Sequence, residues 1–187
     1  MTGQPAPAPF DLVQDFVNTR RISANPAKNA DALSSPAALL AWCRAHGRLV
    51  GADVPTEAEW ADVIAVRDGL RAVLAGHNGG AVDEDADALR RLAAVTADIP
   101  LRVDFPDGAP ALRPAGDANT VRGLLGEVLA AAASGADWSR LKACRDPFCR
   151  EVFYDTSKNR SGAWCSMRVC GSRAKQRRFA QRQRVRG

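Results

Sequence analysis

The stretch CRDPFCREVFYDTSKNRSGAWCSMRVC, residues 144–170, holds four of the five cysteines of the chain. The cysteines form two pairs, with four residues inside each pair and fifteen between the pairs. Structural zinc sites have this organisation, because four thiolates must converge on a tetrahedron about 2.3 Å from the metal. The sequence therefore predicts one structural Zn²⁺ ion, with no open coordination position for a substrate. The predicted metal ligands are Cys144, Cys149, Cys165 and Cys170.

The residues between the two pairs must fold back to bring them together. Residues 151–154 are strand-like, 155–159 turn-like, and 162–164 are predicted to return as a second strand, with Phe153 and Trp164 on one apolar face. Cys165 and Cys170 would lie about 140° apart on a regular helix, so they cannot both bind one ion from it. We expect Cys165 in a turn and Cys170 in the first turn of a following helix, a treble-clef-like arrangement.

Two disulfides or an iron–sulfur cluster are the less favoured alternatives to zinc. Disulfides persist in oxidising compartments, whereas the N-terminal MTGQPAPAPF has no signal-peptide pattern. No apolar run approaches the roughly 20 residues that span a bilayer. We therefore expect a cytoplasmic protein with no membrane association. Cys43, next to Trp42 on a predicted helix, is expected to be a buried core thiol.

Charge is divided unevenly along the chain. Residues 139–187 contain 14 Lys and Arg against three acidic residues, a net charge of +11, whereas the other 138 residues carry −6 and the whole chain +5. Such asymmetry indicates that the C-terminal end meets a polyanion. The alternative is a solvated basic tail without a partner.

Residues 172–187, SRAKQRRFAQRQRVRG, are predicted to form a helix with basic stripes on two flanks. Phe179 is predicted to anchor this helix to the finger. A helix basic on both flanks is suited to insertion between two phosphate backbones, and arginine also binds guanine edges. The predicted nucleic-acid-binding residues are Arg160, Arg168, Ser172, Arg173, Lys175, Arg177, Arg178, Arg182 and Arg184.

The N-terminal part shows helical periodicity with one short change to alternation. Predicted helices begin at Phe10, at Ser35-Pro36, at the Thr56/Glu59 capping box and at the acidic stretch 83–87, and a last one over 120–133 is capped by Asp117 or Asn119. Residues 101–105 and 110–114 are predicted to form a hairpin. The predicted fold class is α+β: a mainly helical N-terminal domain with a small antiparallel β element, then a treble-clef-like finger with four cysteine ligands. The predicted domains are a disordered leader (1–9), the helical domain (10–137) and the finger (138–187).

The cysteine-rich region resembles the bacterial CGNR-type zinc finger, whose pattern has paired cysteines, F-x-D-x-S-x-N, W-C-S-M and C-G-N-R-x-K. Matching positions are Phe153, Asp155, Ser157, Asn159, Trp164, Cys165, Ser166, Met167, Cys170, Gly171, Arg173 and Lys175. The stretch DFVNTR, residues 15–20, resembles the start of the ABATE domain that usually precedes this finger. The sequence departs from the pattern at Ser172, where the family has asparagine, and at Gly162-Ala163, where arginines are common.

The resemblance implies a stress-induced bacterial transcription regulator that binds DNA through its finger. The N-terminal domain would sense a small-molecule effector or oligomerise, for example as a homodimer. Alternatives are an RNA-binding protein, or a protein-interaction adaptor with a purely structural finger. We expect no enzyme, because the sequence offers no nucleophile–base set, no phosphate-binding glycine loop and no open metal site.

Four residues of the N-terminal motif have two interpretations: Asp15, Asn18, Thr19 and Arg20. They could line an effector pocket. Alternatively, Asn18 and Thr19 cap the end of the first helix and Asp15 pairs with an arginine. We favour the second interpretation.

Overall fold

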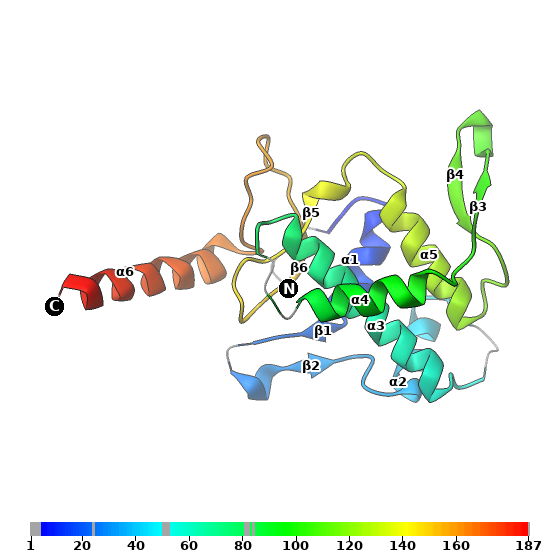
Figure 1. Ribbon diagram of the computed structural model, residues 1–187, viewed down its shortest axis with the longest axis horizontal. Coiled ribbons are helices and arrows are strands. Elements are labelled where there is room, and N and C mark those ends of the chain that lie inside the picture. Colours follow the sequence, from blue (N-terminus) through cyan, green and yellow to red (C-terminus); the bar gives the residue numbers. More distant parts are fainter. Residues whose placement is uncertain (1–4, 24, 50–52, 81–82, 84, 187) are drawn as a thin grey trace.

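The computed structural model describes residues 5–23, 25–49, 53–80, 83 and 85–186 (Figure 1). Its helices are α1 (Phe10–Asn18), α2 (Pro36–Ala45), α3 (Glu57–Gly76), α4 (Asp85–Thr96), α5 (Val121–Ala133) and α6 (Ser172–Arg186). Its strands are β1 (Arg20–Arg21), β2 (Ala30–Asp31), β3 (Leu101–Asp104), β4 (Ala111–Pro114), β5 (Leu141–Ala143) and β6 (Val152–Tyr154). The strands form three separate antiparallel pairs, β1–β2, β3–β4 and β5–β6. The predicted α+β class is confirmed.

The helix starts follow from local capping. The Ser35 hydroxyl accepts the Ala38 N–H at the start of α2, and Thr56 and Glu59 form the predicted capping box of α3. At α5 the prediction was wrong, because the cap is Thr120, whose hydroxyl accepts the Gly123 N–H. Asp117 instead uses its carboxylate to accept the Asn119 N–H, which forms a turn before the helix. In the acidic stretch 83–87, Glu84 lies outside the described residues.

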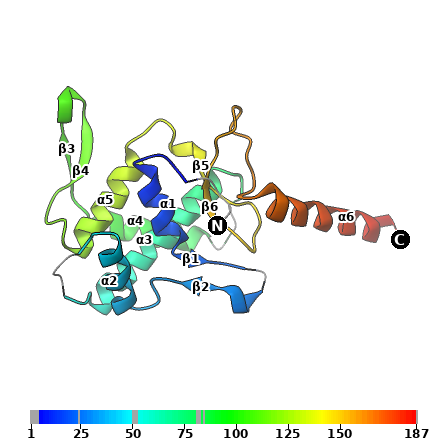
Figure 2. The same ribbon diagram turned by 180° about the vertical axis from the view of Figure 1, so that it is seen from behind.

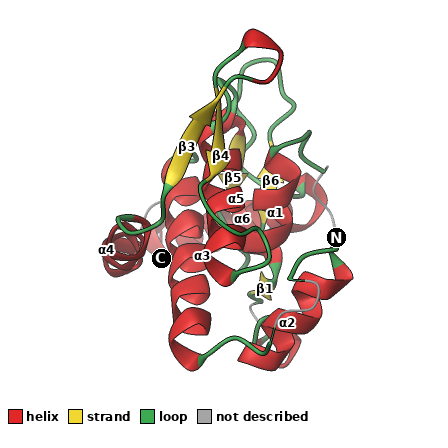
Figure 3. Ribbon diagram, turned by 90° about the vertical axis from the view of Figure 1, so that its right-hand side faces the viewer, coloured by secondary structure: helices red, strands yellow, loops and turns green. Residues whose placement is uncertain are grey.

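The core lies where α1, α3 and α5 meet. Val13, Phe16 and Val17 of α1 are fully buried there, together with apolar residues of α3 and α5. Helix α4 packs across α3 (Figure 3) and approaches so closely at Gly69 that a Cβ there would overlap the Cβ of Leu92. The predicted β3–β4 hairpin is present and projects beyond the helices, away from α6 (Figures 1 and 3).

The hairpin that leads into the finger is part of this core. Leu141, Ala143 and Val152 are at most 1% exposed and belong to the same apolar cluster as α1, α3 and α5. The predicted partner of residues 151–154 was wrong: β6 pairs with β5, and residues 162–164 form no strand. Apolar side chains on β5 and β6 reach the core, whereas residues 162–164 lie in a loop. The β5–β6 hairpin is therefore part of the core of the helical region, whereas Cys144, Phe153, Cys165 and Cys170 form a second, smaller apolar cluster.

Two short segments complete the description of the N-terminal region. The β1–β2 hairpin, which sequence periodicity did not indicate, follows α1 directly. Residues 1–4 of the expected leader lie outside the described residues, whereas Ala6 is buried and its N–H donates to Gln14 Oε1 at 2.6 Å. Among the residues that the structure describes, no helix is both long and apolar enough to cross a membrane.

Candidate zinc centre and nucleic-acid interface

The four cysteines of the finger meet at one point. Their Sγ atoms all lie within 4.8 Å of one another, with Cys149–Cys165 at 3.6 Å and Cys165–Cys170 at 3.8 Å. A tetrahedron with zinc–sulfur bonds of about 2.3 Å has sulfur–sulfur edges of about 3.8 Å. A disulfide would need about 2.05 Å, and all four thiols are free. The donor set therefore fits Zn²⁺, as the sequence predicted.

Two short loops, or knuckles, deliver the ligands. In knuckle 1, residues 144–149, the Asp146 carbonyl accepts the backbone N–H groups of Cys149 and Arg150. In knuckle 2, residues 165–170, the Ser166 hydroxyl accepts the Val169 N–H and opens a single π-helical turn, Met167–Gly171, that carries Cys170 into α6. Cys165 precedes this turn, so the predicted placement of the second pair is confirmed.

The pKa shifts of the clustered cysteines favour a bound cation. Hydrogen bonds from the thiols of Cys149 and Cys165 lower the pKa of Cys144, whereas hydrogen bonds with Cys144 and Cys149 raise the pKa of Cys165. Burial raises the pKa of Cys170. Without a metal, one thiolate is thus stabilised by neighbouring thiols that stay protonated. A bound Zn²⁺ would replace those protons and allow all four sulfurs to ligate as thiolates.

A buried ion pair shapes the loop between the knuckles. Lys142 Nζ lies 2.8 Å from Asp155 Oδ2, and the two side chains are only 6% and 3% exposed. Asp155 also accepts the N–H groups of Ser157 and Gly162. Burial by itself raises the pKa of Asp155, but the hydrogen bonds from Lys142 and Ser157 outweigh it and lower the pKa to about 2. A Cβ at Gly162 would stand 2.7 Å from the Asp155 carboxylate, which explains glycine at this position.

Side chains of the helical region hold the finger in place. The Asn18 amide both donates to the Val152 carbonyl and accepts its N–H, each at 2.8 Å, as a neighbouring strand would. Asn78, at the end of α3, donates to the carbonyls of Ala143 and Ala163. Buried Arg71 donates to the carbonyls of Val17, Arg20 and Arg150. The sequence had indicated Asn18 as a helix cap or a pocket residue, and its contact with the finger was not foreseen. Asn78 and Arg71 carried no sequence signal for this role.

Helix α6 leaves the body and projects into solvent (Figures 1 and 2). Of its side chains, Ala174 is buried, and Arg177 donates to the fully buried Asp146 of knuckle 1 at 3.2 Å. The proposed anchor was wrong, because Phe179 is 57% exposed. Phe179 lies about 200° around the helix from Arg177 and so points away from knuckle 1, and the ion pair of Arg177 and Asp146 holds the helix instead.

The predicted nucleic-acid-binding residues fall into two groups. Three have partners within the protein: Arg177 with Asp146, Arg160 with Asp137 and Ser139, and Ser172 with the Met167 carbonyl. The remaining six are exposed and have no acidic partner among the described residues: Arg168, Arg173, Lys175, Arg178, Arg182 and Arg184. That these side chains contact nucleic acid stays a prediction.

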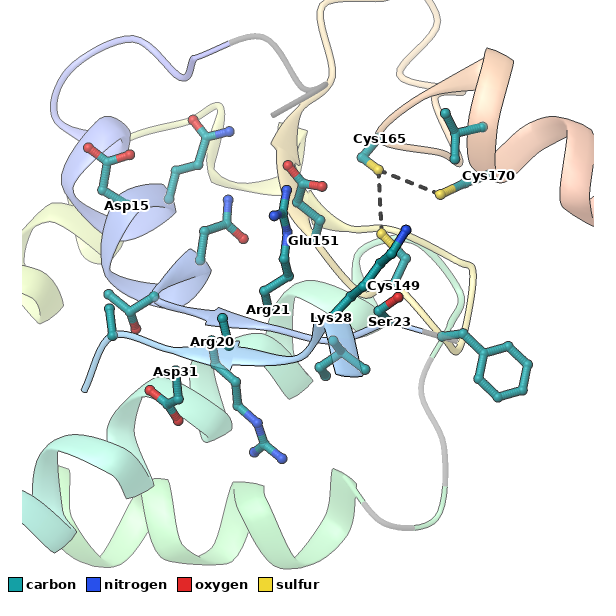
Figure 4. Close-up of a pocket in the computed structure, with 18 of the residues that line it drawn as sticks. Asp15, Arg20, Arg21, Ser23, Lys28, Asp31, Cys149, Glu151, Cys165 and Cys170 are labelled. Atoms are coloured by element: carbon teal, nitrogen blue, oxygen red, sulfur yellow. Dashed lines mark hydrogen bonds between the residues drawn. The ribbon is translucent and has the colours of Figure 1, made fainter. Parts of the chain in front are cut away.

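The N-terminal motif lines a groove of about 990 Å³ (Figure 4). All four residues of the proposed effector pocket border it, but two have structural roles: Thr19 caps α1 by donating to the Phe16 carbonyl, and Asn18 binds Val152. The expectation that Asn18 caps α1 was therefore wrong, because its amide faces β6. Asp15 forms no ion pair among the described residues, contrary to expectation, and Arg20 pairs with Asp68 at 3.1 Å.

Comparison with known families gives two matches. A family described as "Putative stress-induced transcription regulator", ABATE, matches residues 11–137, and one described as "CGNR zinc finger" matches residues 140–183. A comparison with curated proteins gives no match. The first range contains the DFVNTR stretch, and the second contains all four clustered cysteines and most of α6.

Proposed function

The chain belongs to the ABATE family and ends in a CGNR zinc finger, and from this membership we propose that it is a bacterial transcription regulator whose finger directs α6 at DNA. The observation that carries the proposal is the charge of α6. Residues 172–186 contain seven Lys and Arg and no acidic residue. A helix that projects from the body with so little apolar contact is accounted for by a polyanionic partner.

The zinc centre fixes the direction of α6. Cys170 lies two residues before α6 and would hold its start at the metal, and the Arg177–Asp146 ion pair fixes the second turn of α6 to knuckle 1. The exposed basic side chains can then bind backbone phosphates on both flanks, and arginine can donate to both acceptors of a guanine edge in the major groove. Because the four cysteines would fill a tetrahedral site, the zinc ion has no position for a substrate. We therefore assign the zinc ion a structural role and the protein no catalytic one.

The test is fluorescence anisotropy of the full zinc-loaded chain with a labelled 20-base-pair DNA duplex. Removing two phosphate contacts with Arg178→Ala and Arg182→Ala should weaken binding by roughly tenfold to a hundredfold at 0.1 M salt. The matched control is Arg102→Ala with Arg113→Ala, which removes two exposed arginines paired across the distant β3–β4 hairpin. Equal affinities for both double variants would overturn the proposal.

The same assay separates the alternative functions. Tighter binding to a duplex RNA of the same sequence would favour an RNA-binding protein, because α6 would then recognise A-form geometry. Absence of binding to either duplex would favour an adaptor with a purely structural finger. A DNA-binding regulator acts in the cytoplasm, where the four thiols also stay reduced.

We also propose that the N-terminal region senses a small-molecule effector through the groove. Support comes from its volume, which is typical of ligand pockets, and from Arg173, which lines it at the base of α6. A ligand in the groove would touch both the sensing region and the root of the basic helix. In a metabolite screen by thermal shift, we expect at least one stabilising compound whose effect disappears in Arg173→Ala. Hits unaffected by that change would contradict this role.

A further inference from the structure

We propose that the β1–β2 hairpin is a second nucleic-acid contact, in which Arg21 and Lys28 bind backbone phosphates beside the site that α6 occupies. The inference rests on the proposed function, since it extends the surface that binds DNA from the finger into the helical region. Neither residue lies in the finger or in the motif that suggested an effector pocket. Both are exposed, and neither has an acidic partner among the described residues.

Strand alternation turns the two arginines of β1 to opposite sides. Arg20 faces α3, where it pairs with Asp68 at 3.1 Å. Arg21 stands on the other face, and Figure 4 shows Arg21 and Lys28 both rising from the hairpin toward the side where Cys149 lies. These two side chains and Arg173 of α6 line the same groove. Its acidic residues are Asp15, on α1, Glu151, which directly precedes β6, and Asp31, whose carboxylate pairs with Arg67 of α3.

The hairpin is held rigidly despite its short strands. Arg67 of α3, only 1% exposed, binds both carboxylate oxygens of Asp31 at 2.6 and 3.0 Å. In the turn, Asn29 Oδ1 accepts the Ser23 N–H at 2.8 Å. A buried, bidentate arginine pair orders a segment strongly because breaking it would leave a buried charge. The exposed side chains of Arg21 and Lys28 therefore extend from an ordered hairpin.

One side chain connects the β1–β2 hairpin to the finger. Arg71 donates to the Arg20 carbonyl of β1 at 2.8 Å and to the Arg150 carbonyl beside knuckle 1 at 3.3 Å. The hairpin and the knuckle that anchors α6 are therefore fixed relative to each other through one buried guanidinium. Two cationic elements fixed in this way can engage one rigid partner together without the cost of ordering one element relative to the other.

The hairpin turn and α6 extend from the same side of the body, as Figures 1 and 2 both show. A helix that enters the major groove of DNA, about 12 Å wide, is flanked by the phosphate backbones that border it. An element beside such a helix meets one of those backbones. Arg21 and Lys28 offer the point charges that phosphates need, and they carry no demand for a particular base.

A competing explanation is that Arg21 and Lys28 only offset the zinc centre, because four thiolates and one Zn²⁺ leave a net negative charge. The two explanations differ in what the cations change. Phosphate contacts set the salt dependence of DNA affinity, whereas charge compensation sets the retention of zinc.

The test compares four double variants of the full zinc-loaded chain with the wild type, one of them the α6 variant Arg178→Ala, Arg182→Ala, by anisotropy with the same DNA duplex at salt concentrations from about 50 to about 200 mM. For Arg21→Ala with Lys28→Ala, the slope of log affinity against log salt should become shallower by about 1.8, and affinity at 0.1 M salt should fall by roughly tenfold to a hundredfold. Arg21→Lys with Lys28→Arg should keep the wild-type slope. The Arg102→Ala, Arg113→Ala control should also keep it.

The outcomes separate the two proposals. If Arg21→Ala with Lys28→Ala keeps the wild-type slope while Arg178→Ala with Arg182→Ala gives a shallower slope, the proposed hairpin contact is refuted and the proposed role of α6 stands. If the wild type itself binds without salt dependence, the proposed function fails first. Loss of zinc from the hairpin variant, measured by mass spectrometry, with an unchanged slope would establish charge compensation instead.

Discussion

Arg177 and Arg178 are adjacent on α6 but are predicted to have different roles: Arg177 holds α6 to knuckle 1, and Arg178 binds DNA. Arg177 donates to Asp146, whose carboxylate is fully buried, and Asp146 Oδ2 has no partner among the described residues. Arg177→Ala leaves that carboxylate with the Phe148 N–H as its remaining partner. A hydrogen bond to a charged group contributes about 1.5–3 kcal/mol. Since the Arg177 side chain is 44% exposed, solvent screening lowers the expected loss to about 1–2 kcal/mol.

The assay is thermal unfolding of the zinc-saturated protein with the two single variants side by side. For a chain of this length, a loss of about 1–2 kcal/mol lowers the melting temperature by roughly 2–8 °C. Arg178 faces solvent, so Arg178→Ala should melt within about 1 °C of the wild type and weaken DNA binding. A double-mutant cycle of Arg177→Ala with Asp146→Asn should give a coupling free energy near ~1 kcal/mol. Identical melting of Arg177→Ala and Arg178→Ala would refute the claim that this ion pair aims the helix.

Three further predictions concern the interior. Asp155→Asn leaves Lys142 buried without its counter-ion and should lower the free energy of unfolding by about 3–5 kcal/mol, measured by chemical denaturation. Because the pKa of Asp155 is lowered to about 2, the greater stability of the wild type is complete above about pH 4 and disappears as the pH falls through about 2. Equal stability of the two proteins at neutral pH would contradict this prediction. Asn18→Ala should cost about 1–2 kcal/mol and speed exchange of the Val152 amide, because the buried Val152 N–H loses its side-chain acceptor while the Val152 carbonyl keeps the Gln14 amide as a donor at 3.1 Å; unchanged exchange would argue against it. After zinc chelation the two knuckles lose the ion that would hold their sulfurs together, so a thiol reagent should label the four clustered cysteines quickly and Cys43, which is 0% exposed in the main apolar core, slowly; labelling of all five at one rate would count against a buried Cys43.

The sequence predicted what local spacing determines. The cysteine spacing indicated the metal cluster, the capping residues of α2 and α3 marked their starts, and the alternation over 101–105 predicted β3–β4. Cys165 and Cys170 were placed correctly because five residues do not fit one face of a helix. Each of these inferences uses residues within one turn or one hairpin of each other.

Apart from the cap of α5, which is Thr120 and not Asp117 or Asn119, the main errors came from contacts that local patterns do not show. Strand β6 pairs with β5 because Leu141 and Val152 both reach a core formed by α1, α3 and α5, which no local pattern reveals. Asn18 was interpreted as a helix cap, yet its amide completes a strand pair 134 residues away. Arg71 joins the hairpin to the finger through backbone carbonyls, and carbonyls carry no sequence signature.

The most direct test of the central claim is the salt dependence of DNA affinity for the full zinc-loaded chain. If α6 and its surroundings bind about six to eight phosphates, the slope of log affinity against log salt should be roughly −5 to −7. Chelation of zinc should make the slope shallower, because α6 loses the knuckle that holds its first residue. A flat salt dependence in the zinc-loaded protein would contradict the account.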